Sequence, residues 1–155
     1  QALNINPNRA ETLSKLGTVY SQMEKYDDAI ITLKKSIDLK PDDPLTHFNL
    51  AVTYGKMNQH KNAIESVKET IRLMPNFPDA HGFLGFSYTN LEMHAEAAGA
   101  YKAAIRLNPD DPRMHLGLGK AYVMMGERSS ALDEYKILMK LDPGTANTLF
   151  NIIYN

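Results

Sequence analysis

The stretch Pro78–Asp111, PDAHGFLGFSYTNLEMHAEAAGAYKAAIRLNPDD, matches the chain again when it is shifted by 34 residues in either direction. Residues of the same kind recur in three further in-phase copies at the positions of Leu84, Gly85, Tyr88, Ala97, Ile105, Leu107 and Pro109. A period of this length is typical of solenoids, in which each repeat buries its apolar face against its neighbours. The chain is therefore expected to be a repeat array.

The period divides the whole chain. We expect a single solenoid domain, 1–155, with the tail of a preceding repeat in 1–9, complete repeats at 10–43, 44–77, 78–111 and 112–145, and a partial repeat or capping helix in 146–155. Because Gln1 falls inside a repeat, we expect the chain to be a fragment of a longer protein.

Each copy reads as two helices. Pro44, Pro78 and Pro112 suit a first helical turn, where the missing N–H is not needed, and Asp43 or Asp111 can cap the helix that follows. The second helices are expected to end at Leu39, Leu73, Leu107 and Leu141, since a proline stands two residues after each.

Small residues recur on both helices of each copy. We expect those of the first helix to face those of the second, so that the two backbones approach closely. The residues are Gly17, Ala51, Gly85 and Gly119 on the first helices and Ala29, Ala63, Ala97 and Ala131 on the second. A larger side chain at these positions is expected to overpack the hairpin.

With these residues the copies resemble the tetratricopeptide repeat (TPR) family over essentially the whole chain. The resemblance rests on Leu-Gly or Leu-Ala, a Tyr three residues on, then Ala, an apolar cluster and Pro. His47, His81 and His115 depart from it, where the family often has another large residue, and so does Leu138. The resemblance implies an all-α right-handed superhelix whose first helices line a concave groove, and a non-catalytic adaptor or scaffold that binds a protein or peptide.

Composition gives little sign of other partners. The net charge of −1 does not favour a nucleic-acid or anionic membrane surface, and no apolar run is long enough to insert in a membrane. The absence of cysteine excludes thiolate catalysis and leaves the compartment open, with the cytoplasm favoured.

No motif predicts chemistry, so we expect no catalytic residue, cofactor or metal. The five histidines follow the repeat, and equivalent side chains on stacked hairpins lie roughly 8–10 Å apart, whereas zinc ligands lie ~2 Å from one metal. Gly117–Lys120 is no phosphate loop, because Ala121 replaces the required Ser or Thr and no strand precedes it. Asp42-Asp43 and Asp110-Asp111 are explained as caps and turns.

The binding surface is expected on the first-helix residues that point away from the hairpin. In the first copy these residues are polar, and from the second copy onward they are apolar and aromatic with a cationic edge, which is typical of a binding site. The candidates are Phe48, Asn49, Val52, Lys56, Phe83, Phe86, Asn90, Arg113, Lys120 and Val123. The alternative for Phe48, Phe83 and Leu116 is burial between neighbouring first helices.

Three functions stay open. A groove for a protein segment with apolar anchors comes first. A chaperone C-terminal tail is disfavoured. The resemblance implies a carboxylate clamp built by three successive first helices. If the clamp starts on the first copy, only Asn49 matches it, and if it starts on the second copy, only Arg113 does. Self-assembly comes second, through the groove or through the apolar C-terminal residues Phe150, Ile153 and Tyr154. A docking arm cut from a larger enzyme comes last, because the Asn ladder of such arms is broken by Lys15, Phe83 and Gly117.

Overall fold

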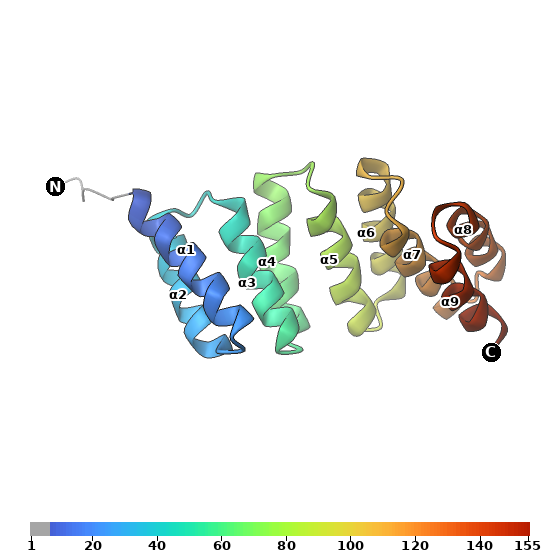
Figure 1. Ribbon diagram of the computed structural model, residues 1–155, viewed down its shortest axis with the longest axis horizontal. Coiled ribbons are helices and arrows are strands. Elements are labelled where there is room, and N and C mark those ends of the chain that lie inside the picture. Colours follow the sequence, from blue (N-terminus) through green and yellow to red (C-terminus); the bar gives the residue numbers. More distant parts are fainter. Residues whose placement is uncertain (1–6) are drawn as a thin grey trace. The chain divides into compact units, whose positions relative to one another are not determined.

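The computed structural model describes the backbone of residues 7–155 and the side chains from Arg9 onward. Every regular element in this part of the chain is an α-helix (Figure 1). The helices are α1 (Pro7–Gln22), α2 (Tyr26–Leu39), α3 (Pro44–Lys56), α4 (His60–Leu73), α5 (Pro78–Asn90), α6 (His94–Leu107), α7 (Pro112–Met124), α8 (Arg128–Leu141) and α9 (Pro143–Tyr154). The expected all-α architecture of helical hairpins is confirmed.

The helices form two compact units, which are described separately. Unit 1 ends at Pro75 and contains α1–α4, and unit 2 is Asn76–Asn155 and contains α5–α9. Within each unit, every helix packs on the next helix along the chain, and first helices also contact each other, α1 with α3 and α5 with α7. The predicted tail of a preceding repeat lies outside the described residues up to Asn6, and its last residues belong to the first turn of α1.

Proline and aspartate start the first helices, as predicted, although not always through the predicted contact. Pro44, Pro78 and Pro112 each stand in the first helical turn. The Asp111 side chain caps α7 by accepting a hydrogen bond from the backbone N–H of Arg113. The Asp43 carboxylate makes no such bond and instead accepts one from the Thr46 hydroxyl. Asp43 therefore occupies the N-cap position of α3, as predicted, but its side chain makes no hydrogen bond to a backbone N–H of the helix.

One residue with a positive φ turns the chain inside each hairpin. These residues are Glu24, Asn58, Glu92 and Gly126, with φ between 58° and 76°. They are spaced by the repeat, so the same turn closes all four hairpins. Only the fourth uses glycine, the residue that adopts this conformation without steric cost.

In the first and third hairpins the glycine of the first helix admits the second helix, as expected, whereas Gly119 of the fourth hairpin admits Leu149 of α9 instead. A Cβ atom on Gly17 would lie 2.6 Å from Leu33 Cγ of α2, and one on Gly85 would lie 2.9 Å from the Tyr101 ring of α6. The four paired alanines on the second helices are completely buried. The hairpins are therefore held by close packing, in which a single added methylene group is enough to affect stability.

The last helix departs from the pattern. Pro143 was expected to stop α8, and it also begins α9, so that Asp142 alone connects the two helices. The Asp142 carboxylate accepts hydrogen bonds from the Gly144 N–H and the Thr145 hydroxyl at the start of α9. Residues 146–154 therefore lie in a helix that starts three residues earlier than the predicted repeat boundary.

Candidate protein-binding surfaces

A polar groove lies between the first helices of unit 1. It consists of two cavities of about 400 and 120 Å³ that share Thr18 of α1 and Asn49 of α3. We call it the Asn49 groove. Its lining residues are Ala10, Glu11, Ser14, Lys15, Thr18, Ser21, Gln22, Lys40, Asp43, Leu45, Asn49, Val52 and Lys56. Three predicted binding residues, Asn49, Val52 and Lys56, thus line one surface.

Asn49 is oriented by a chain of hydrogen bonds. Its Nδ2 donates to Thr18 Oγ1 at 3.0 Å, and the Thr18 hydroxyl donates to the backbone oxygen of Ser14 at 2.9 Å. The second amide hydrogen and Oδ1 of Asn49 have no partner among the described residues. The half-buried amide therefore retains one donor and one acceptor, the two groups that an extended peptide backbone requires.

The charges of the Asn49 groove have both signs. Lys15 pairs with Glu11 at 2.7 Å on exposed side chains, and Lys56 Nζ donates to the backbone oxygen of Ser21 at 3.2 Å. Lys40 and Asp43 complete the charged lining. The groove therefore favours a segment with polar groups of both kinds over one of a single charge.

The first-helix face of unit 2 presents aromatic and apolar side chains. Phe86 of α5 is 46% exposed and its ring lies 6.0 Å from that of the half-buried Phe83. Asn90, one turn further on, donates its amide to the backbone oxygen of Phe86 at 2.8 Å and is exposed. Phe86 is therefore the predicted aromatic residue that reaches furthest into solvent in α5.

On α7, Lys120 and Val123 are half-buried, and Val123 packs against the buried cluster around Ala131 and Leu138. Lys120 has no ion-pair partner in the part of the chain that the structure describes. Phe48 and Leu116 are also half-buried. They are therefore neither fully open to a partner nor fully buried between neighbouring first helices, the two alternatives considered for them.

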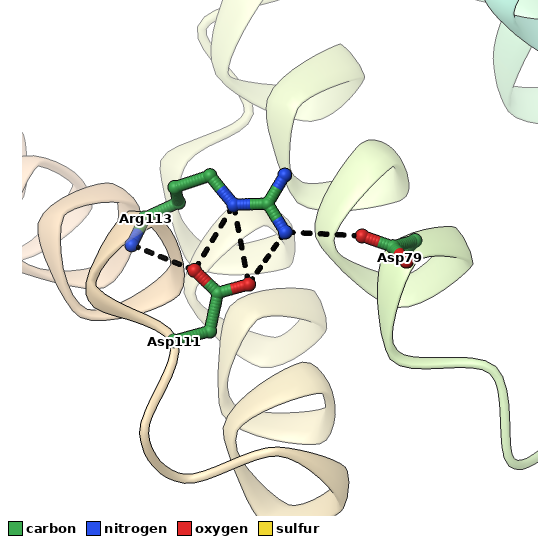
Figure 2. A network of polar contacts seen from close by, with 3 residues as sticks. All are labelled: Asp79, Asp111 and Arg113. Carbon is green, nitrogen blue, oxygen red and sulfur yellow. Dashed lines mark hydrogen bonds and ion pairs between the residues drawn. The ribbon is translucent and has the colours of Figure 1, made fainter.

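Arg113 is held in a network of carboxylates (Figure 2). Its Nε lies 3.0 Å from Asp111 Oδ1, while Nη2 donates to Asp111 Oδ2 at 2.6 Å and to Asp79 Oδ1 at 3.1 Å. The side-chain hydrogen bond from Arg113 lowers the pKa of Asp111 below its usual value. Two carboxylates and one guanidinium leave the network with a net negative charge, so Arg113 does not provide the free cation that the sequence suggested.

The C-terminal helix carries a separate aromatic cluster. The Phe150 ring lies 4.5 Å from that of Tyr154 and 5.7 Å from that of Tyr135, and Arg128 stands 4.4 Å from the centre of the Tyr154 ring. Phe150 and Tyr154 are 41% and 53% exposed. Ile153, expected as an intermolecular contact, is instead buried with Leu149 inside unit 2 and is not available to a partner.

Sequence reasoning missed a cavity on the other side of unit 2. About 560 Å³ lies between the second helices α6 and α8, over α7, and the buried His115 forms part of its lining. His115 Nδ1 lies 2.7 Å from Glu134 Oε2 and its Nε2 2.7 Å from the backbone oxygen of Pro109. The sequence contained no signal for this cavity, because Glu134 and His115 lie far apart in the chain and neither belongs to a motif.

The described residues carry no cluster of three or more His, Cys, Asp or Glu side chains that could hold a metal ion. Searching them for a helix long and apolar enough to cross a membrane also yields none.

The hairpins and their groove define an α-helical repeat module for protein interaction, a fold that is typically non-catalytic. One family model of the tetratricopeptide repeat matches residues 17–58 and 91–126, and another matches residues 46–77. The chain belongs to the tetratricopeptide repeat family. A comparison with curated protein sequences gives no match.

Solved structures of MamA are similar to this chain. One crystal structure of MamA has a TM-score of 0.84 at 29% identity, covering 92% of this chain and 83% of that one. MamA from Desulfovibrio magneticus RS-1 shares the fold, with a TM-score of 0.82 at 21% identity over 91% of this chain and 78% of that one. The first TPR of Spaghetti (RPAP3), bound to an HSP90 peptide, also shares it, with a TM-score of 0.77 at 22% identity over 81% and 99% of the two chains.

Proposed function

We propose that the chain binds an extended segment of a partner protein on its first-helix faces. The main support for the proposal is the geometry of Asn49. Its amide is oriented by Thr18 and retains a donor and an acceptor inside the groove of unit 1. A half-buried, oriented amide of this kind suits a peptide unit of the partner. Binding there orders little of the protein, since the groove already exists in the free chain.

The first-helix faces of the two units, each taken by itself, offer different chemistry to such a segment. The Asn49 groove is lined mainly by polar residues, with Ala10, Leu45 and Val52 as its apolar side chains, and suits backbone and polar groups of a partner. On unit 2, Phe86 offers an exposed aromatic surface next to Phe83 and Asn90, and Lys120 of α7 is a further candidate. Aromatic side chains dominate the energetics of most interfaces, so an apolar anchor of the partner fits here.

A chaperone tail does not suit these faces. The RPAP3 structure holds the HSP90 peptide SRMEEVD, which ends in an aspartate and has two glutamates close before it. Here Arg113 is already paired with Asp79 and Asp111, and the first helix of unit 1 presents Ser14 and Thr18 where a carboxylate clamp needs a lysine and an asparagine. We therefore propose a partner segment without an acidic terminus.

The test begins with peptides selected from a phage-displayed random library on the isotopically labelled chain. Adding a selected peptide is expected to shift the backbone amide signals of Ser14, Thr18, Asn49 and Val52. Shifts confined to α2 and α4 would contradict the proposal. Asn62→Ala, which removes an exposed amide from α4, serves as the control and is expected to leave the affinity unchanged.

Self-assembly is the second candidate, and the aromatic cluster of α9 favours it. Phe150 and Tyr154 expose aromatic rings that contact each other beside the Arg128 guanidinium, and aromatic and arginine side chains are enriched at interfaces. Light scattering over a wide concentration range is expected to show an oligomer that dissociates when Phe150 and Tyr154 are both replaced by Ser. A monomer at every concentration would exclude this candidate.

A further inference from the structure

The cavity between α6 and α8 is a second, separate surface that the proposed function does not use. It belongs to the second helices of unit 2, whereas the proposed partner binds first-helix faces. Its volume, about 560 Å³, is in the range of ordinary binding sites. Ile105, Leu118 and Ile137 give it an apolar wall.

The floor of the cavity is electrically neutral in this geometry. The Pro109 carbonyl can only accept, so Nε2 of His115 carries a hydrogen, and the 2.7 Å contact between Nδ1 and Glu134 Oε2 requires one more shared proton. Whichever of the two groups holds that proton, the pair has no net charge. Glu134 therefore does not offset the cations of the cavity.

Two cations line the rim of the cavity. Lys102 and Arg106 stand on α6, both exposed, and neither has a carboxylate partner in the described part of the chain. The Lys102 ammonium lies 5.2 Å from the centre of the Tyr122 ring, which holds it beside the cavity. The cavity thus carries an uncompensated positive charge.

Gly99 gives an independent indication of a ligand. It lies within α6, and a Cβ atom built on it would meet nothing within 4 Å, so close packing does not require a glycine there. Glycine in a helix interior reduces stability relative to alanine. A glycine without a packing role, at the rim of a cavity, leaves room for the backbone of a second molecule to approach closely.

We propose that this cavity binds an acidic peptide segment of a partner protein that carries an aliphatic side chain beside its carboxylates. The carboxylates pair with Lys102 and Arg106, the aliphatic side chain contacts Ile105 and Ile137, and the peptide backbone passes over Gly99. An open trough between two helices suits a peptide, and the charge of the rim selects an acidic one.

The test is a selection from a phage-displayed random-peptide library, carried out in parallel on the native chain and on Gly99→Leu. The Cβ atom of the leucine meets no atom within 4 Å, and leucine forms helices more readily than glycine, so we expect the variant to keep its fold, which circular dichroism checks. We expect the native chain, but not Gly99→Leu, to enrich peptides that combine Glu or Asp with Leu, Ile or Val. Enrichment of the same peptides by both chains, or no acidic enrichment, would overturn the proposal.

Titration of a selected, fluorescein-labelled peptide completes the test. Lys102→Glu with Arg106→Glu is expected to weaken it by about tenfold or more. The matched control reverses the charges of Lys136 and Lys140, the exposed residues of α8 that are equivalent to Lys102 and Arg106 in the repeat and lie outside the cavity. It is expected to leave the affinity within about twofold. An equal loss in both double variants would show only a general charge effect and would refute the site, as would binding of dodecanoate with no binding of the peptide.

Discussion

Leu149 of α9 packs into the notch that Gly119 leaves on α7, where a Cβ atom would lie 2.5 Å from Leu149 Cδ2. In the first and third hairpins the equivalent glycine admits the hairpin's own second helix, at Leu33 or Tyr101. The fourth hairpin therefore gives this notch to the next helix, and α9 becomes part of the core of unit 2. Leu149 is completely buried as a result.

Gly119→Ala is expected to destabilise the chain. The added methyl must displace the buried Leu149, and overpacking of this kind costs about 1–3 kcal/mol. Urea unfolding followed by circular dichroism measures the change. Gly99→Ala is the matched control on a helix of the same unit, where the methyl meets no atom, and it is expected to stabilise by about 1 kcal/mol. Equal effects of the two substitutions would refute this packing account.

The network of Asp111 and Arg113 predicts a loss of stability in acid. Because the folded-state pKa of Asp111 is lowered, its stabilising contribution is present above the unfolded pKa of about 4 and is lost as the pH falls through the folded-state pKa. Asp111→Asn keeps a capping side chain and removes this titration. Unfolding midpoints at neutral and acidic pH are expected to differ less in the variant than in the native chain, and an identical difference would contradict the prediction.

His115→Phe is expected to cost about 1–3 kcal/mol, because it leaves the Glu134 carboxylate and the Pro109 carbonyl without their buried donor. His47, at the equivalent position two repeats earlier, bonds the Pro41 carbonyl at an exposed site. His47→Phe is therefore the control, and thermal unfolding of both variants makes the comparison. A similar loss in the two would show that burial of the bond is not what matters.

Phe86→Glu is expected to weaken partner binding by about tenfold or more without unfolding the chain. The side chain is nearly half exposed, so the charge remains solvated in the free protein. Fluorescence anisotropy of a selected peptide measures binding, and circular dichroism checks the fold. Undiminished affinity in a folded variant would remove Phe86 from the binding surface.

The repeat and its helices were predictable because local residues determine them. Pro44, Pro78 and Pro112 each begin a helix in the structure, and the prolines after α2, α4 and α6 stand beyond the ends of those helices. Pro143 shows the limit of this reasoning. A proline fits both the end of one helix and the first turn of another, since neither position needs its N–H. That Pro143 also begins a helix follows from the packing of α9 on α7 and α8, which the local sequence does not show.

The candidate sites were less predictable, because the repeat pattern does not determine which side chains pair with each other in the folded chain. Arg113 and Lys120 are both cations on α7, yet only Arg113 meets carboxylates, one of them on α5. The polar residues of α1 were recognised as a separate face, but the groove that Ser14 and Thr18 form with Asn49 follows from tertiary packing. Ile153 is as apolar as Phe150 and Tyr154, which are exposed, yet it lies in the core.

The central claim is that the first-helix face, centred on Asn49, binds the partner. The most direct test is the dissociation constant of a peptide selected on the native chain, measured for the native chain, Asn49→Ala and the control Asn62→Ala. The account predicts a loss of about tenfold or more for Asn49→Ala, since a partner's backbone groups lose their donor and acceptor, and no loss for the control. Equal affinity of all three chains would contradict it.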